Sequence, residues 1–331
     1  MAAAPRIAVV GLGQWGRNLV RNAHALGALA MVYDDAPAVR EAFAVSHPDV
    51  RVARAVEDIW SDSCIEGVMI ATPAATHGAL AAAGIDAGKH VFVEKPLCLD
   101  IGEAVRLKAQ SEKAGRVLMV GHLLLYHPAF RALSKAASSG ALGTLRYIYA
   151  NRASLGRIRR EENALWSFAP HDISMILTLA GRMPFSVACS GGQFLAVGVA
   201  DTTLSHLDFG TALQAHIFVS WLHPYKDQRL VVIGSDAMVV FDDVEQGAQK
   251  LRLYRHKAQW DGNIPIVTRA DVEPVPYEGA EPLRLECEAF LAAMRGERQP
   301  PSDGEEGIRV LRVLDACQRA LYTGERVKLL P

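Results

Sequence analysis

Short apolar runs alternate with amphipathic stretches over residues 5–122 of this chain. The runs that we expect to form strands are Ile7–Val10, Leu29–Tyr33, Val50–Ala53, Val68–Ala71, Val91–Val93 and Val117–Val120. Helical periodicity falls between them, at Gln14–Leu26, Val39–Val45, Val56–Trp60, Ala75–Asp86 and Ile101–Ala114. Strands that are apolar throughout belong to a sheet covered on both faces. The pattern therefore predicts an α/β fold with a doubly wound parallel sheet.

The pattern changes after residue 122, and this change predicts two domains, residues 1–122 and 123–331. In the second domain we expect a helix over Ala129–Ser138 and a strand over Leu145–Ala150. Further strands are expected at 186–199, 201–209, 212–221, 229–241 and 251–255, with turn residues between them. A last helix repeats apolar residues from Ile308 to Leu321. It is a candidate to pack back on the N-terminal domain.

The turn after the first strand carries glycines at the spacing G-x-G-x-x-G, at Gly11, Gly13 and Gly16. The first allows a tight turn, the second lets backbone approach a pyrophosphate, and the third lets the helix pack closely on the strand. The helix N-terminus then offers unpaired N–H groups and a positive dipole end to phosphates. We expect a dinucleotide to bind here, in contact with Gln14 and Trp15.

Asp34 closes the second strand, about 20 residues after the glycines, where a carboxylate binds the adenosine ribose. An acid at this position favours NAD over NADP, because a 2′-phosphate would meet negative charge. Asp35 adds to that repulsion, whereas Arg40 is placed to reach a phosphate. NAD is therefore the expected cofactor, with NADP as the second choice.

Two later strand-to-helix turns lie at the edge where ligands bind in open α/β sheets. In the first, Thr72 and Pro73 are expected against the cofactor. His77 either joins them or is a structural histidine at the helix start.

The second of these turns reads Glu94-Lys95-Pro96. Proline restricts Lys95 to an extended conformation, so its side chain has a defined direction. A partly desolvated lysine can donate to a substrate hydroxyl or relay a proton, so Lys95 is a catalytic candidate. A surface ion pair with Glu94 is the alternative, but that pair would not require Pro96.

The glycine loop, Asp34, Ala71-Thr72-Pro73 and Glu94-Lys95-Pro96 occur in the order found in one known family. In this, the whole chain resembles the glucose-fructose oxidoreductase / inositol dehydrogenase / MocA family. The resemblance implies a Rossmann domain followed by an α/β domain with a large open, mainly antiparallel sheet that commonly mediates oligomers. It implies an active site between the domains, with Glu94 and Lys95 at the cofactor.

The segment from Asn151 to Asn163 is rich in arginine and leads directly to Trp166 and His171. Its arginines are Arg152, Arg157, Arg159 and Arg160. Arginines beside an aromatic residue and a candidate base suit a substrate that carries phosphates. A solvated charged surface is the alternative.

His171 opens an apolar helical run after Pro170, so we expect it at a helix start. The dipole there would lower the pKa of the imidazole and favour its neutral form, which can act as a base. His171 also occupies the histidine position of the family. Many members have Asp four residues earlier, where this chain has Ser167, so Asp172 or Asn163 is a candidate for part of that role.

The segments Gln14–Asn22, Asn151–Asn163 and Leu165–Ser174 resemble family members that act on UDP-N-acetylhexosamines. Those members form a 3-keto sugar, which an aminotransferase uses in making 2,3-diamino sugars for cell-surface glycans or lipid A. The resemblance therefore implies NAD-dependent oxidation of the 3-OH of UDP-N-acetylglucosamine. The residues that we assign to the substrate are Tyr126, Arg152, Arg160, Asn163, Trp166 and Asp172.

The expected mechanism uses Lys95 and His171 on one hydroxyl. His171 would remove its proton, hydride would pass to nicotinamide, and Lys95 would hydrogen-bond the oxygen. A dehydrogenase of a free sugar, inositol or a UDP-uronic acid is the alternative enzyme. A catalytically silent NAD-binding regulator is the alternative of another class, and it would need neither side chain.

Composition limits the remaining function classes. The 331 residues are half hydrophobic with a formal net charge of −1, which argues against nucleic-acid or anionic-membrane partners. No apolar run approaches the ~20 residues of a membrane span, and no secretory signal pattern is present. Five scattered cysteines suit a reducing compartment, and the histidines lack metal-ligand spacing. We expect a cytoplasmic homo-oligomer, a dimer or tetramer, without a metal.

Overall fold

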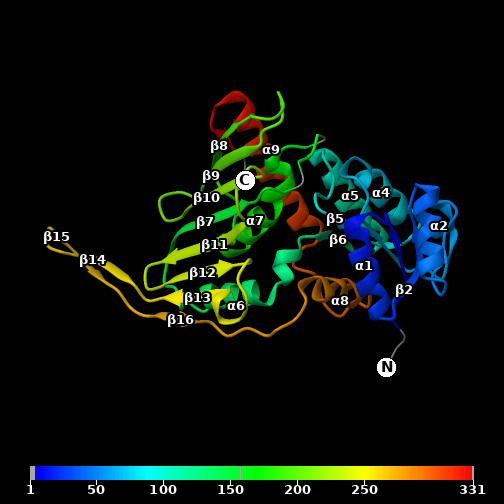
Figure 1. Cartoon of the computed structure of the whole chain (residues 1–331), viewed down its shortest axis with the longest axis horizontal. Helices are drawn as coiled ribbons and strands as arrows, with labels where there is room; N and C mark the ends of the chain where they lie inside the picture. Colours follow the sequence, from blue (N-terminus) through cyan, green and yellow to red (C-terminus); the bar gives the residue numbers. More distant parts are fainter. Residues whose placement is uncertain (1–3, 157, 161, 330–331) are drawn as a thin grey trace. The chain divides into compact units, whose positions relative to one another are not determined.

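The computed structural model describes residues 4–156, 158–160 and 162–329, which form two compact units (Figure 1). Unit 1 comprises residues 1–126 and 280–311, and unit 2 comprises residues 127–279 and 312–331. The sequence pattern predicts a single break after residue 122. The structure differs because residues 280–311 return to unit 1, which local periodicity does not reveal.

Unit 1 contains, in its described residues, a six-stranded parallel sheet with the order β3-β2-β1-β4-β5-β6. Its strands are β1 (Ile7–Val10), β2 (Leu29–Tyr33), β3 (Arg51–Val52), β4 (Gly67–Ile70), β5 (His90–Glu94) and β6 (Leu118–Gly121). Strands β1, β4 and β6 are buried along their length, as expected for a sheet covered on both faces. The doubly wound sheet predicted from the sequence is confirmed.

The helices of unit 1 connect these strands and follow the predicted periodicity. They are α1 (Gln14–Ala25), α2 (Pro37–Ser46), α3 (Glu57–Ser61), η1 (Ala74–Thr76), α4 (His77–Asp86), α5 (Ile101–Ala114) and η2 (Leu123–Tyr126). A further helix, α8 (Pro282–Met294), comes from the returning segment and contacts α1 and η2. The sequence analysis did not predict α8. The long helix α9 (Gly304–Thr323) is divided between the units at residue 311.

Unit 2 is built on a nine-stranded sheet with the order β16-β13-β12-β11-β7-β10-β9-β8-β17. Its strands are β7 (Leu145–Ala153), β8 (Ser186–Gly192), β9 (Thr202–Asp208), β10 (Gln214–Ser220), β11 (Asp227–Gly234), β12 (Met238–Asp242), β13 (Leu251–Tyr254), β16 (Val272–Pro274) and β17 (Val327–Lys328). Among the described strands of this nine-stranded sheet, only β7 and β10 pair in parallel. The mainly antiparallel open sheet is therefore confirmed.

Helices α6 (Pro128–Ser138) and α7 (Ala164–Ala180) pack on this sheet, α7 against β7, β9 and β10. Two predicted strands have different limits in the structure. The run 229–241 is a hairpin of β11 and β12, because Ser235 and Asp236 form a turn. The run 186–199 stops at Gly192, where the chain leaves the sheet; the short helix η3 (Gly247–Gln249) precedes β13.

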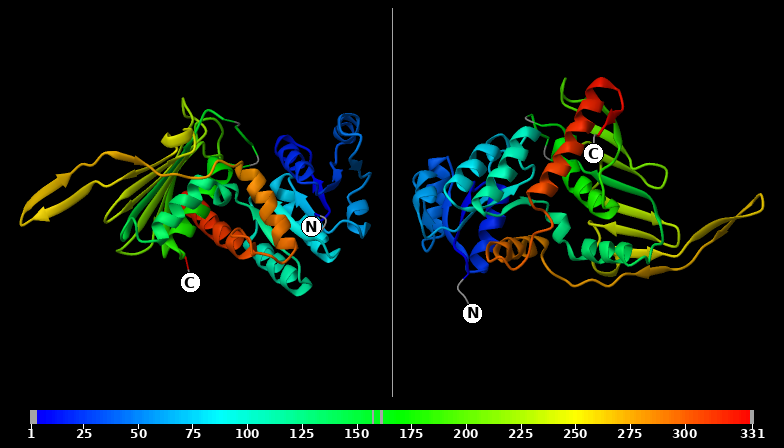
Figure 2. Two further views of the ribbon diagram at one scale, coloured as in Figure 1. Left: turned by 90° about the horizontal axis from the view of Figure 1, so that it is seen from below. Right: turned by 180° about the vertical axis from the view of Figure 1, so that it is seen from behind.

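A second, two-stranded sheet extends from unit 2, formed by β14 (Lys257–Asp261) and β15 (Ile264–Thr268). Every residue of both strands is exposed. Figure 2 shows this hairpin extending well beyond the nine-stranded sheet of its own unit. Of the helices described, none combines the length and the apolar character that a membrane crossing requires.

Candidate active site

The glycine loop of unit 1 has the geometry that a dinucleotide requires. Gly11 has a φ of +94°, and a Cβ on it would lie 2.7 Å from the carbonyl oxygen of Ala71. A Cβ on Gly16 would lie 1.9 Å from the carbonyl oxygen of Gly11, so α1 can begin this close to the loop only without a side chain. A Cβ on Gly13 would meet nothing within 4 Å. Gly13 therefore faces open space, where a pyrophosphate can approach the backbone.

Asp34 joins the end of β2 to this loop. Its Oδ2 accepts a hydrogen bond from the backbone N–H of Leu12 at 2.7 Å, and its Oδ1 accepts one from Ala36 at 3.0 Å. The Arg40 guanidinium is held by the same turn, because Nη1 donates to the carbonyl oxygens of Asp34 and Asp35 at 2.6 and 3.0 Å. The sequence predicts an acid here that favours NAD, with Arg40 as the residue that could reach a 2′-phosphate. In the structure the arginine already binds backbone.

His77, a predicted cofactor contact, is buried between the two ligand-edge turns. Its ring is 1% exposed, and Nδ1 and Nε2 lie 2.7 and 2.8 Å from the carbonyl oxygens of Pro96 and Thr72. The two carbonyls belong to the two ligand-edge turns, so the imidazole holds these turns together. This burial favours the structural alternative for His77, while Thr72 and Pro73 keep surface that a cofactor can reach.

Glu94, predicted at the cofactor, is a buried link between the glycine loop and the Glu-Lys-Pro turn. Its Oε1 accepts a hydrogen bond from the indole N–H of Trp15, and its Oε2 accepts one from the backbone N–H of Lys95 at 3.3 Å. Burial raises the pKa of Glu94 to about 7, although the Trp15 hydrogen bond and the Lys95 charge oppose this shift. The Lys95–Pro96 bond is cis, and the Lys95 side chain is half-buried. Lys95 is thus held at the carboxyl end of β5, as predicted.

Tyr126 is assigned to the substrate by the sequence, but the structure places it in the core of unit 1. The side chain is fully buried, and its hydroxyl lies 2.8 Å from Oγ of Ser302. Next to it, His122 Nδ1 lies 2.5 Å from a carboxylate oxygen of Glu306. These contacts fasten the start of α9 to the end of β6, and they involve partners about 180 residues away that no local pattern indicates.

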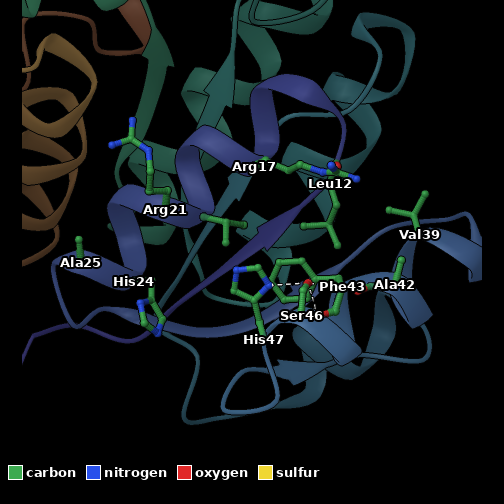
Figure 3. Close-up of a pocket in the computed structure, with 11 residues that line it drawn as sticks. Leu12, Arg17, Arg21, His24, Ala25, Val39, Ala42, Phe43, Ser46 and His47 are labelled. Atoms are coloured by element: carbon green, nitrogen blue, oxygen red, sulfur yellow. Dashed lines mark hydrogen bonds between the residues drawn. The ribbon is translucent and has the colours of Figure 1, made fainter.

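Unit 1 also has a cavity of about 510 Å3 between α1 and α2 (Figure 3). Phe43 stacks on His47 at its α2 side, with ring centroids 4.3 Å apart. The basic residues of α1 around it have partners, since Arg21 binds Glu281 and His24 lies 2.9 Å from Asp49. We therefore assign no ligand to this cavity.

In unit 2, His171 lies in the middle of α7, and this corrects the predicted helix start. The helix begins at Ala164, because the side chain of Asn163 accepts a hydrogen bond from the backbone N–H of Trp166 and caps it. Pro170 lies inside the helix, where it lacks the N–H that would bond to the carbonyl oxygen four residues earlier. A helix dipole therefore cannot be the reason for a neutral His171. Ser167 lies one turn before His171 on the same face of α7, at the position of the family Asp.

Asn163 and Trp166 share one partner in α9 that the sequence analysis missed. Gln318 Oε1 accepts a hydrogen bond from Nδ2 of Asn163 at 2.8 Å and one from Nε1 of Trp166 at 2.9 Å. The sequence assigns both side chains to the substrate. In the structure they fix the first turn of α7, and Trp166 remains half-exposed.

Arg152 and Asp172 are also predicted at the substrate, but they are buried and bind each other. Nε and Nη2 of Arg152 donate to the two carboxylate oxygens at 2.9 and 3.0 Å. Burial raises the pKa of Asp172, and the Arg152 charge opposes that shift. Because both oxygens are taken by one guanidinium, Asp172 is a poor candidate to replace the missing family Asp.

Of the other arginines in this segment, the two that the structure describes are exposed. Arg159 forms an ion pair with Glu162 at 3.0 Å, and Arg160 is exposed to solvent. Arg157 lies outside the described residues. Of the predicted substrate contacts, Arg160 and Trp166 are therefore the ones that keep accessible surface. No group of three or more His, Cys, Asp or Glu side chains that could hold a metal ion occurs within the described ranges.

Comparisons with known proteins assign the two halves of the chain to one family. Residues 5–122 match the oxidoreductase family model described as an NAD-binding Rossmann fold, and residues 130–240 match the GFO/IDH/MocA C-terminal domain. The chain belongs to the Gfo/Idh/MocA family. It is an oxidoreductase of this family, and unit 1 contains the NAD-binding Rossmann domain.

Relatives of this Gfo/Idh/MocA chain match it over nearly their full length. It is 28% identical to UDP-N-acetylglucosamine 3-dehydrogenase of Acidithiobacillus ferrooxidans over 92% of this chain and 94% of the relative. It is also 28% identical to inositol 2-dehydrogenase of Rhizobium meliloti, over 98% and 99%. A solved structure of the Acidithiobacillus enzyme matches with a TM-score of 0.83 and 27% identity, covering 96% and 97% of the two chains. The family predicted from the motifs is confirmed.

Proposed function

We propose that this chain is an NAD-dependent dehydrogenase that oxidises a ring hydroxyl of a nucleotide sugar, with the 3-OH of UDP-N-acetylglucosamine as the best candidate. Its product would be the 3-keto sugar used in diamino-sugar synthesis for cell-surface glycans or lipid A. The main support is Lys95 at the ligand edge of an NAD-binding Rossmann domain, in a chain that also carries His171 at the histidine position of the family.

The cofactor preference is supported by the surroundings of Asp34. Its carboxylate is fixed by the N–H groups of Leu12 and Ala36, so it stands at the end of β2 with a defined orientation. A ribose hydroxyl can donate to such a carboxylate, whereas a 2′-phosphate would be repelled. Arg40 is bound to backbone carbonyls of the same turn, which leaves it less able to neutralise a phosphate. We therefore propose NAD rather than NADP.

The proposed chemistry assigns one role to each of two side chains. The imidazole of His171 accepts the proton of the substrate hydroxyl, and the ammonium group of Lys95 donates a hydrogen bond to the same oxygen as negative charge develops on it. NAD, when bound, supplies the hydride acceptor. Glu94 Oε2 accepts a hydrogen bond from the backbone N–H of Lys95. This bond limits the conformations of the Lys95 backbone, and so the positions that the ammonium group can reach.

The substrate proposal rests on the relatives and on the exposed basic segment. A UDP-N-acetylglucosamine 3-dehydrogenase matches nearly the whole chain. Exposed Arg160 suits a diphosphate, and half-exposed Trp166 suits a planar base. Inositol 2-dehydrogenases are equally similar in sequence, so a free polyol is the second candidate.

The decisive experiment is NADH formation by the purified chain with a panel of hydroxylated substrates. The panel contains UDP-N-acetylglucosamine, UDP-N-acetylgalactosamine, UDP-glucuronic acid, free N-acetylglucosamine and myo-inositol, each with NAD and with NADP. We expect the highest kcat/KM for UDP-N-acetylglucosamine with NAD. If inositol were the only panel member turned over, a free polyol would be the substrate and the nucleotide-sugar proposal would be wrong. Binding of NAD without turnover of any panel member would favour a regulator.

We also propose that the chain forms a homo-oligomer through unit 2. One face of the nine-stranded sheet carries half-exposed aromatic side chains, among them Tyr149 stacked on His216 with ring centroids 5.2 Å apart. On the β14–β15 hairpin, alternation places Ala258, Trp260, Pro265 and Val267 on one entirely apolar, exposed face. An isolated two-stranded hairpin is marginal in water, so a second copy is the proposed cover.

Light scattering coupled to size exclusion tests this assembly. The wild-type chain should have the mass of a dimer or tetramer, and Trp260→Asp should shift it toward the monomer without loss of secondary structure. A monomeric wild-type chain would overturn the proposal.

A further inference from the structure

Helix α8 lies antiparallel to β5, and its side chains pack against residues at successive levels along this strand. The ring of Phe290 packs against Phe92, with centroids 5.9 Å apart. One turn later, Met294 lies against Gly67, since a Cβ on this glycine would be 2.8 Å from the Met294 methyl group, and Gly67 pairs with His90 at the start of β5. The helix therefore runs from the end of β5 toward its start.

The same register brings Glu286 to Glu94. Glu286 lies one turn before Phe290, and Glu94 lies two residues after Phe92 on the same face of β5. Four residues of helix rise about 6 Å and two residues of strand about 6.6 Å, so the two pairs have nearly equal spacing. The electrostatic interaction between the carboxyl groups of Glu286 and Glu94 agrees with this placement.

Glu286 is the more unusual of the two acids. Its side chain is 0% exposed, and neither carboxyl oxygen has a hydrogen-bond partner within the part of the chain that the structure describes. An ionised carboxylate would be costly in such a position, whereas a neutral carboxylic acid offers an O–H donor. Burial raises the pKa of Glu286 well above its ordinary value, and the charge of Glu94 raises it further.

Several titratable and hydrogen-bonding groups surround the Glu94–Glu286 pair. Glu94 receives the Trp15 indole N–H and the Lys95 backbone N–H, and its charge interacts with Lys95 and with His122. A charge on Glu286 raises the pKa of the two buried groups next to it, the Tyr126 hydroxyl and the Cys287 thiol. Above pH 7, where Glu94 has lost its proton, its carboxylate is thus the charged acceptor, among the facing groups described, that an O–H on Glu286 can serve.

We propose that Glu286 is protonated and donates a hydrogen bond to Glu94, and that this carboxyl pair positions Trp15 at the glycine loop and Lys95 at the substrate. Glu286 is then a positioning residue that touches neither substrate nor cofactor. Its catalytic consequence rests on the proposed function of Lys95, whereas the proton on the pair does not depend on it.

Two variants separate positioning from packing. In Glu286→Gln, the amide N–H replaces the O–H donor and cannot ionise, so kcat at neutral pH should stay near wild type. The part of the alkaline fall in wild-type kcat that comes from loss of the Glu286 proton should be absent. In Glu286→Leu the donor is gone, so kcat should fall by about 10- to 100-fold. The chain should still fold, because leucine is apolar, as suits a buried position, and Glu94 keeps the N–H donors of Trp15 and Lys95. The matched control is Glu288→Gln on the same helix, where Glu288 is partly exposed and paired with Arg284.

Infrared difference spectroscopy of the full chain reads the proton without any turnover. At pH 8, above the pKa of about 7 of Glu94, wild type minus Glu286→Gln should show the carbonyl band of a protonated carboxylic acid, and the band should disappear only at higher pH. Absence of this band would overturn the proposal, as would a Glu286→Leu variant with the kcat and pH profile of wild type. If no panel substrate is turned over but the band is present, the proposed function fails and the carboxyl pair stands.

Discussion

The indole N–H of Trp15 donates a hydrogen bond to the carboxylate of Glu94, which lies 79 residues later in the chain. This bond joins the two motifs that define the ligand edge of unit 1. Trp15 belongs to the first turn of α1 and is 39% exposed, whereas Glu94 is buried at the end of β5. A cofactor that binds at the glycine loop would therefore lie close to Trp15, whose hydrogen bond to Glu94 connects it to the turn that carries Lys95.

The two later glycines of the loop should respond differently to alanine. Gly16→Ala places a Cβ 1.9 Å from a carbonyl oxygen, so we expect the unfolding free energy to fall by about 1–3 kcal/mol and NAD binding to be lost. Gly13→Ala meets no protein atom within 4 Å, so it should fold normally but weaken NAD binding. Thermal unfolding and calorimetric titration with NAD measure both. Normal NAD affinity in Gly13→Ala would show that the pyrophosphate does not lie there.

Removal of either proposed catalytic side chain should affect kcat far more than cofactor binding. Lys95→Ala and His171→Ala should each lower kcat by at least ~100-fold, because each removes a group that acts on the reacting hydroxyl. The NAD dissociation constant should change little, since the loop contacts and Asp34 remain. Steady-state kinetics and NAD titration test this pair. A variant with near-normal kcat would lose its catalytic assignment.

The Arg152–Asp172 pair should contribute to the free energy of unfolding and not to substrate affinity. Arg152→Met leaves the Asp172 charge buried without its partner, so it should lower the unfolding free energy by about 3–5 kcal/mol. The double variant Arg152→Met/Asp172→Leu should recover part of this loss. Urea unfolding provides the measurement, with exposed Arg160→Met as the control that should keep full stability. A raised KM in Arg152→Met at unchanged stability would return Arg152 to the substrate site.

The stability of unit 2 should depend on pH through His127. Its Nδ1 accepts a hydrogen bond from the backbone N–H of Ala129 at 3.1 Å and so caps α6 in the neutral form. Burial lowers its pKa from 6.5 to about 4. The unfolded chain therefore binds a proton first, and stability should be lost as pH falls from 6.5 toward 4.

His127→Asn tests this dependence, because asparagine caps a helix without titrating. Its melting temperature should fall less than that of wild type over the same acidic range. Parallel melting curves at all pH values would show that His127 does not titrate on unfolding.

The sequence by itself determined the elements that follow from local rules. The strands and helices of residues 5–122 are set by continuous apolar runs and helical periodicity, and the glycine loop is set by backbone positions that admit no Cβ. These properties act over a few neighbouring residues, so local spacing alone is enough to place Gly11, Gly16 and Asp34. The Glu-Lys-Pro turn is likewise predictable as a site, because its residue types suit the end of a buried strand.

Only the tertiary structure decided what the polar side chains of these segments bind. His77 binds two backbone carbonyls, Arg152 binds Asp172, and Tyr126 contacts Ser302 across 176 residues. Such partners are set by packing, because a buried polar group must pair with whatever the fold brings near. The helix that carries Glu286 shows this most clearly. Its periodicity could have suggested a helix, but only the return of α8 to unit 1 places a carboxyl group against Glu94.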